Sequence, residues 1–201
     1  MPSSQMPAPL PTPPAAIGRR QLAPGETLFF QGDRAFAVFA VRHGRIRLLR
    51  HLADGSTVAL YVAHDGETFA EAALFSDVYH CDAIADVASE IDIHPKEALS
   101  QALDDDRLAA KTFMAHLARQ VISLRARLEI RNIRLAEERV IHFLQLAVDD
   151  HDLSVTFLRP LKDIASDIGL THEAFYRTLS KLERSGTITR HKRTLTLVER
   201  A

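Results

Sequence analysis

The chain has 201 residues, with 25 lysine and arginine residues against 26 aspartate and glutamate residues and a formal net charge of −1, a length that allows one large or two small domains. Its 46% hydrophobic and 25% charged residues are typical of a globular protein, and its single cysteine excludes a disulfide framework, a cysteine-rich zinc module and an iron–sulfur cluster. No apolar run approaches the roughly 18–20 residues that span a bilayer and no secretory signal is visible, so we expect a cytoplasmic protein without a membrane partner.

The N-terminal half changes from a proline-rich segment to short β-like runs. Residues 1–18 hold five prolines between Pro7 and Pro14, which predicts a disordered tail, with a short interaction motif as the alternative. From residue 19 to about residue 103, apolar or alternating runs are separated by turn signals such as His43-Gly44. The expected strands are 27–31, 35–42, 45–50, 56–62 and 83–94. This spacing predicts an antiparallel β-roll of the jelly-roll kind.

A helical period follows the acidic run Asp104–Asp106, whose carboxylates suit a helix N-terminus. Apolar residues then recur at intervals of three and four, and Leu135 extends the pattern past a polar break at Arg131. The seam consists of Met114, Leu117, Val121, Leu124 and Leu128. A seam this regular predicts a coiled-coil homodimer, with a helix packed on its own domain as the alternative. With a second helix near 136–148, the dimerisation helix and hinge span 104–150.

Residues 151–201 have the pattern of a winged helix-turn-helix. A short helix with its apolar face at residues 161–168 ends at Gly169, and Thr171 stands at the N-cap of a second helix over about 172–185. After Gly186, strands 187–190 and 194–198 predict a hairpin with a basic tip. The fold class is therefore α+β: a β-roll, a long helix and a winged helix-turn-helix.

The second helix of this motif carries residue types that read DNA bases. Glu173 and Arg177, four residues apart, share one face; arginine can grip guanine and glutamate can accept from cytosine. An ordinary ion pair worth about 0.3–0.5 kcal/mol is the alternative. His172 and Tyr176 are further candidate contacts to bases or phosphates, and Thr171 is a candidate DNA contact at the start of the helix. The residues expected to contact phosphate are Lys162, Arg190, Lys192 and Arg193.

The near-zero net charge conceals a segregation that fits double-stranded DNA as the partner. Residues 1–103 carry 8 basic and 12 acidic residues, 104–150 carry 8 of each, and 151–201 carry 9 basic and 6 acidic. The excess of positive charge therefore lies in the expected DNA-reading segment.

The run LKDIASDIGLTHEAFYRTLSKLERSGTI closely resembles the recognition motif of the Crp/Fnr superfamily of bacterial transcription regulators. The segments GETLFFQGD, VRHGRIRLLR, ADGS and GETFAEAALF resemble that family's cyclic-nucleotide-binding-like β-roll, so the likeness covers roughly 19–200. The resemblance implies a homodimer joined by the long helix, a two-fold symmetric operator, an effector in the β-roll and RNA polymerase as a partner.

The effector pocket departs from the family's cyclic-AMP-binding pattern. Glu71 keeps the position of the glutamate that holds the ribose, but Ala70 replaces a glycine. Cys81 stands where that branch has the phosphate-binding arginine, and Asp82 where it has serine or threonine. A thiol and a carboxylate supply no cation for a phosphodiester. We therefore expect no binding of cyclic AMP or cyclic GMP.

Other signals are open at this position. Glu71, His80, Cys81 and His64 have the ligand types of a copper or zinc site, and the family also has a haem-sensing branch. A thiol redox switch at Cys81, an organic ligand, or a vestigial pocket are the alternatives. Two rivals concern the whole protein. One is a binding module whose winged domain pairs with protein; the other is an enzyme, for which no catalytic motif is present.

Overall fold

The computed structural model describes residues 18–148, 153–157 and 161–198. They form two compact units, an N-terminal unit up to Leu117 and a C-terminal unit from Ala118 onward. Apart from Gly18, the predicted proline-rich tail lies outside the described residues, as does the side chain of Lys162.

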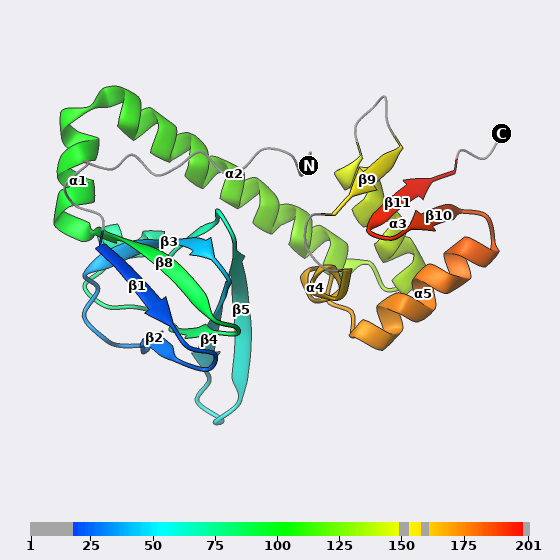
Figure 1. Cartoon of the computed structure of the whole chain (residues 1–201), viewed down its shortest axis with the longest axis horizontal. Helices are drawn as coiled ribbons and strands as arrows, with labels where there is room; N and C mark the ends of the chain where they lie inside the picture. Colours follow the sequence, from blue (N-terminus) through cyan, green and yellow to red (C-terminus); the bar gives the residue numbers. More distant parts are fainter. Residues whose placement is uncertain (1–17, 149–152, 158–160, 199–201) are drawn as a thin grey trace. The chain divides into compact units, whose positions relative to one another are not determined.

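The N-terminal unit is built on two four-stranded antiparallel sheets (Figure 1). In spatial order, the strands of the first sheet are β1 (Gly18–Leu22), β8 (Ser89–Pro95), β3 (Ala37–His43) and β6 (Thr68–Phe69). Those of the second are β2 (Thr27–Phe29), β7 (Asp82–Ala85), β4 (Arg45–His51) and β5 (Thr57–His64). Each expected run corresponds to one of these strands, except that 83–94 is divided between β7 and β8; β1 and β6 were not predicted.

Aromatic side chains fill the space enclosed by these sheets. Phe29, Phe39, Phe69 and Tyr79 are each at most 3% exposed, and the ring centroids of Phe29 and Tyr79 lie 3.7 Å apart. The Tyr79 hydroxyl donates to the carbonyl of Ala37 at 3.0 Å, so its polar end is also satisfied. The apolar positions of the alternating runs are therefore those that face the interior of the roll.

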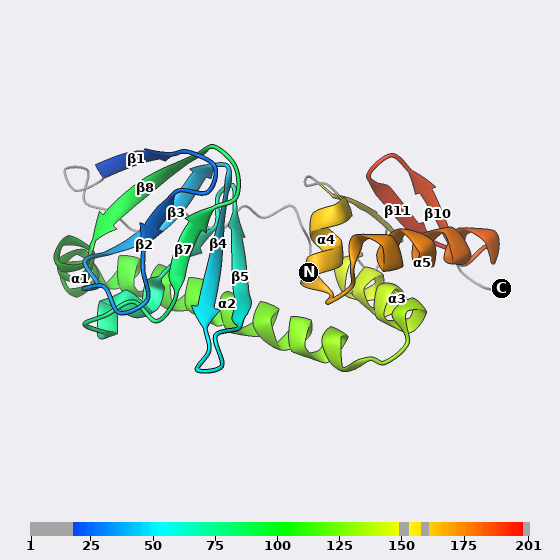
Figure 2. The same cartoon turned by 90° about the horizontal axis from the view of Figure 1, so that it is seen from below.

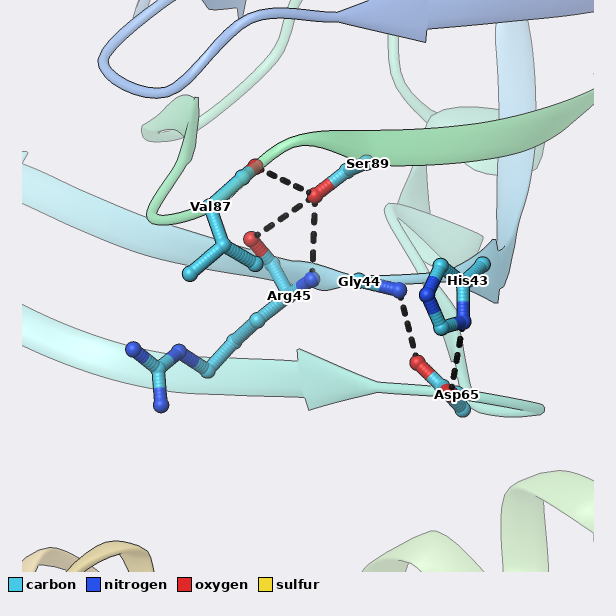
Figure 3. Close-up of polar contacts among 6 residues, drawn as sticks. All are labelled: His43, Gly44, Arg45, Asp65, Val87 and Ser89. Atoms are coloured by element: carbon cyan, nitrogen blue, oxygen red, sulfur yellow. Dashed lines mark hydrogen bonds and ion pairs between the residues drawn. The ribbon is translucent and has the colours of Figure 1, made fainter.

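The turn from β3 to β4 admits only glycine (Figure 3). Gly44 has φ of 106°, and its N–H donates to Asp65 Oδ1 at 2.7 Å. The Ser89 hydroxyl, on the other side, accepts from the Arg45 N–H at 3.0 Å and donates to the Val87 carbonyl at 2.8 Å. A Cβ at Gly44 would lie 2.7 Å from Ser89 Cα, a backbone atom that has little room to move.

Helices α1 (Lys96–Asp105) and α2 (Arg107–Asn132) follow β8. Residues 96–103, which the sequence placed in the β-rich segment, are helical; the run KEALSQAL after Pro95 consists largely of strong helix formers. Leu99 of α1 and Phe113 of α2 pack against Val38 of β3. The 3₁₀ helix η1 (Glu71–Phe75), also not predicted, contributes the half-buried Leu74 to this cluster.

Helix α2 begins and ends where its sequence changes character. Asp106 Oδ1 accepts from the Leu108 N–H at 2.7 Å, so the last residue of the acidic run is used at a helix start as predicted. Asp104 and Asp105 instead belong to the last turn of α1. The helix ends at Asn132, and Leu135 stands at the N-cap of α3 (Ala136–Ala147). The extension of the seam to Leu135 is therefore wrong, because the chain leaves the helix before it reaches that residue.

The C-terminal unit contains α3, α4 (Leu161–Asp167), α5 (His172–Arg184) and a small sheet (Figure 2). The sheet runs β10 (Ile188–His191), β11 (Thr194–Leu197), β9 (Ser154–Thr156), of which only β9 was not predicted. Val140, Ile164, Phe175 and Leu179 form the centre of its core and are fully buried. With the two antiparallel sheets and the long helix, this unit confirms the predicted α+β fold.

Candidate functional site

The turn between α4 and α5 is set by three consecutive residues. Gly169 ends the first helix with φ of 68°, and the Leu170 N–H then donates to the Ala165 carbonyl at 2.9 Å. The Thr171 hydroxyl accepts from the Ala174 N–H at 3.2 Å, as predicted for an N-cap. These contacts fix the start of α5 relative to α4, as a helix-turn-helix requires.

Helix α5 has one buried and one exposed face. Phe175, Leu179 and Leu182 are at most 3% exposed, as their helical spacing predicts. Glu173 and Arg177 are exposed, and neither makes a hydrogen bond or ion pair with another of the described residues. The ordinary ion pair considered for them is absent from this part of the structure. Both side chains are available to a partner.

Other predicted contact residues on α5 and the hairpin are already engaged within the chain. The rings of His172 and Tyr176 lie 4.6 Å apart, and the Arg190 guanidinium lies 5.9 Å from the Tyr176 ring centroid. Arg190 also forms an ion pair with Glu183 at 3.0 Å. Arg190 thus braces the exposed face of α5, whereas sequence alone grouped it with the other basic residues of the hairpin tip.

The tip of the β10–β11 hairpin is the exposed basic end of the C-terminal unit. Lys192 adopts φ of 53°, and both Lys192 and Arg193 are exposed. On α5 itself, Lys181 is tied to Glu137 of α3 by an ion pair. The tip thus carries exposed cations, and α5 carries exposed side chains that have no partner among the described residues.

The α2 seam is largely unburied in the single chain. Met114, Val121, Leu124 and Leu128 are between 46% and 63% exposed. Leu117 is half-buried and packs against the cluster around Val38. One member of the seam therefore packs on its own unit, while the others leave an apolar stripe uncovered.

Glu71 lies at the start of η1 and is directed into the N-terminal unit. Ala70 before it has φ of 64°, a backbone conformation that favours glycine, as the resemblance implies for this position. The Thr68 hydroxyl donates to the Glu71 carboxylate and lies 2.7 Å from His116 Nε2. His116 of α2, which is 5% exposed, also lies 3.5 Å from Glu71. Sequence reasoning missed His116, since no local pattern links it to Glu71.

Asp82 is buried on β7 and is satisfied by the chain itself. Its Oδ1 accepts from the Gln31 N–H at 2.7 Å, and its Oδ2 lies 2.8 Å from His51 Nε2. Burial raises the pKa of the neighbouring Cys81 thiol, against an opposing effect of Arg50. Arg50 donates its Nε to the His80 carbonyl at 3.1 Å.

The structure does not assemble the predicted metal ligands. Glu71 contacts Thr68 and His116, while the His80 ring lies 3.1 Å from the Ser76 hydroxyl. Among the described residues, which include Glu71, His80, Cys81 and His64, no three histidine, cysteine, aspartate or glutamate side chains come together as a metal site. The residues are near in sequence, but His64 ends β5, Glu71 begins η1, and His80 and Cys81 lie in the bend before β7, so the contacts of Glu71 and His80 are separate.

An open cavity of about 440 Å³ lies on the N-terminal unit, and His80, one of the predicted metal ligands, is among its lining residues. It is lined by Gln31, Gly32, Arg50, Val78, Tyr79 and His80. Glu71, Cys81 and Asp82, the predicted pocket residues, are not among its lining residues.

One further buried imidazole lies outside every predicted site. His94 on β8 is 5% exposed, and its Nδ1 has no hydrogen-bond partner among the described residues. Burial lowers the pKa of His94, and the charge of Asp92 opposes this effect.

Comparison with known families identifies both units. Residues 19–106 match the cyclic nucleotide-binding domain, and residues 138–201 match the Crp-like helix-turn-helix domain. None of the described helices combines the length and apolar character needed to cross a membrane.

Individual relatives extend over most of the chain. The cyclic AMP receptor protein of Thermus thermophilus is 26% identical over 177 residues, 85% of this chain and 79% of that protein. The nitrogen fixation regulation protein FixK of Bradyrhizobium diazoefficiens is 27% identical over 179 residues, 86% of this chain and 75% of that protein.

Among solved structures, FixK2 from Bradyrhizobium japonicum shares the fold with a TM-score of 0.66 at 22% identity, over 92% of this chain and 94% of that one. The matched families and relatives are regulators, which confirms the prediction that the chain is not an enzyme. The two matched domains and these relatives together show that the chain belongs to the Crp/Fnr family of DNA-binding transcription regulators.

Proposed function

We propose that the protein acts as a homodimer that binds an inverted-repeat operator and responds to a signal other than a cyclic nucleotide. The observation that carries this proposal is the exposed, unpaired pair Glu173 and Arg177 on a helix whose start is fixed by the Thr171 cap. Side chains held on a rigid element and left without internal partners are suited to engage base edges.

In this proposal each subunit places α5 in the major groove of double-stranded DNA. Arg177 reads guanine through its two parallel N–H donors, and Glu173 accepts from cytosine. Lys192 and Arg193 at the hairpin tip contact phosphate, with Lys162 as a further candidate. Because Arg190 is paired with Glu183 and lies over Tyr176, we assign it the role of holding Tyr176 and the hairpin in place.

The uncovered part of the α2 seam supports the homodimer. Met114, Val121, Leu124 and Leu128 present apolar surface that a second copy of α2 would bury. A two-fold dimer presents two copies of α5 to half-sites about one helical turn apart. RNA polymerase, the further partner that the family implies, and a cytoplasmic location complete the proposal.

The surroundings of Glu71 and Asp82 disfavour a cyclic nucleotide. Glu71 is engaged by Thr68 and His116, and Asp82 is a buried acceptor beside a thiol. A ligand with a phosphodiester would meet negative charge where it needs donors. Burial of the Cys81 thiol also disfavours a redox switch, because a raised pKa lowers the thiolate fraction. Among the signals considered, these contacts leave an organic ligand as the better candidate than a cyclic nucleotide or a thiol switch, with regulation by abundance as the alternative.

Copper, zinc or haem stays a prediction from the sequence. The test is metal analysis and an absorption spectrum of the freshly purified protein, beside the Cys81→Ala variant. A colourless, metal-free protein would remove this hypothesis. Bound metal in the analysis, or a haem absorption band, that is lost in Cys81→Ala would establish it.

The DNA and ligand parts of the proposal have separate tests. Repeated selection of random duplexes should enrich an inverted repeat, and fluorescence anisotropy should show salt-dependent binding to it. Enrichment of sites without two-fold symmetry would contradict the homodimeric reading. Calorimetry at neutral pH should detect no heat with cyclic AMP or cyclic GMP, and micromolar binding of either would refute the ligand part.

A further inference from the structure

Arg139 of α3 joins two segments of the C-terminal unit through backbone carbonyls alone. At the end of α2, its Nη2 donates to Ile133 O at 2.6 Å and to Arg131 O at 3.3 Å, and its Nε donates to Ile133 O at 3.0 Å. At the turn between α4 and α5, its Nη1 donates to Gly169 O at 2.9 Å and to Ile168 O at 3.3 Å. One guanidinium thus bridges the end of the long helix and the turn that precedes α5.

The packing around Gly169 is a second observation of this junction. A Cβ built on Gly169 would lie 3.2 Å from Arg131 Cγ and 3.6 Å from Arg139 Nη1. The turn therefore lies directly against the two arginines, and a side chain at this position would require Arg131 to shift by a few tenths of an ångström. Contacts on either side hold α3 in place: His142 with Glu129 of α2 at 2.9 Å, and Lys181 of α5 with Glu137.

We propose that Arg139 is a positioning residue for DNA reading. It fixes the α4–α5 turn to the end of α2, and so sets the angle at which α5 meets the DNA. This inference rests on the proposed function, since it concerns the site that Glu173 and Arg177 form.

The chemistry of the side chain suits this role. A guanidinium has five N–H donors in a planar fork, so it can serve carbonyls of two segments at once. A lysine ammonium keeps the charge but cannot span both sets of carbonyls with the same geometry. Loss of the bridge leaves α5 free to tilt. Tilting weakens base contacts, which depend on direction, more than phosphate attraction, which depends mainly on distance.

The test compares Arg139→Gln with Arg134→Gln in the full-length protein. Arg134 is exposed between α2 and α3 and has no hydrogen bond or ion pair among the described residues, so its variant removes the same charge without removing the bridge. Affinity is measured by anisotropy for a duplex selected with the wild-type protein and for a scrambled duplex of equal length, at one salt concentration.

We expect Arg139→Gln to lower the ratio of specific to non-specific affinity by about tenfold or more, while scrambled-duplex affinity changes less than about twofold. Arg134→Gln should leave that ratio unchanged. Arg139→Lys should fall between wild type and Arg139→Gln, a graded order that loss of folded protein would not produce. Melting curves and oligomeric state are recorded for each variant.

Three outcomes overturn the inference: an unchanged ratio in Arg139→Gln, an equal loss in Arg134→Gln, or the absence of a cooperative melting transition in both Arg139 variants. The last would make Arg139 a residue of stability alone. Failure of the proposed function is a different result, because the wild-type protein would then enrich no duplex at all.

Discussion

The candidate binding side chains of the two units differ in burial and in hydrogen bonding. In the N-terminal unit the carboxylates of Glu71 and Asp82 are turned inward and are satisfied by partners such as Thr68 and the Gln31 N–H. In the C-terminal unit Glu173 and Arg177 are exposed on one face of α5, without partners among the described residues.

The difference concerns what each unit must do to bind. A ligand at Glu71 must first break contacts that the chain makes with itself, and the broken groups are costly to leave unpaired. A ligand that binds at α5 displaces only water, because the capped helix already holds Glu173 and Arg177 in place and neither side chain has to break a contact among the described residues. The C-terminal unit is thus preorganised for its partner, whereas the N-terminal unit must rearrange to accept one at Glu71.

The largest change in operator affinity should come from the α2 seam, through which two copies of the chain would form the dimer. Leu124→Glu places a charge in the apolar stripe, so we expect a monomer whose operator affinity is lower by about 10²–10⁴ because the second half-site is lost. Ile122→Glu is the matched control, since Ile122 is 52% exposed on α2 but lies off the seam. Sedimentation and anisotropy measure both effects. Dissociation by Ile122→Glu as well would remove the seam as the interface.

The next largest effect should be confined to the N-terminal unit. Gly44→Ala combines a strained φ with a clash against Ser89, and we expect the free energy of unfolding of this unit to fall by about 2–4 kcal/mol. Gly55→Ala is the control, because Gly55 has φ of 81° but nothing within 4 Å of an added Cβ. Urea unfolding should show a larger loss of unfolding free energy for Gly44→Ala than for Gly55→Ala. Equal losses would show that the clash with Ser89 contributes nothing.

At the C-terminal unit, Arg177→Ala should cost about 1–3 kcal/mol of operator affinity and relax the preference at one base pair. Lys192→Ala should weaken all duplexes alike and reduce the salt slope by about one. Binding titrations over several salt concentrations, with operator and scrambled duplexes, distinguish the two. Identical, sequence-independent losses would contradict the division between base and phosphate contacts.

The smallest effect concerns pH and His94. Because burial lowers its folded-state pKa, the unfolded chain binds this proton more readily, and stability falls as the pH drops below the ordinary imidazole range. The stability contributed by neutral, buried His94 is fully present above that range and is lost as the pH falls towards the folded-state pKa. His94→Leu should therefore show a smaller decrease in Tm between pH 7.5 and pH 5.5 than the wild type. An equal decrease would place the acid sensitivity elsewhere.

Local signals in the sequence were sufficient for much of the C-terminal unit. The buried face of α5, the Thr171 cap and the β10–β11 hairpin each follow from residues within one or two turns of chain. Such features depend on local backbone geometry and on residues close in sequence, so they can be predicted from the sequence alone.

The N-terminal site was less accessible to such reasoning, because its contacts join distant residues. Glu71 of η1 meets His116 of α2, and Asp82 of β7 meets Gln31 and His51, and no local pattern in the sequence specifies these long-range contacts. Proximity in sequence instead suggested a metal cluster. Arg139 was missed for a related reason: its partners are backbone carbonyls, which every residue has and no sequence motif marks.

The uncovered apolar stripe of α2 has a consequence for dosage. If two copies are needed to bury it, the amount of dimer at low concentration rises as the square of the amount of chain. Operator occupancy would then change more steeply than synthesis of the protein. A regulator whose N-terminal unit binds no signal at all would still possess a threshold, placed by the strength of its own dimer contact.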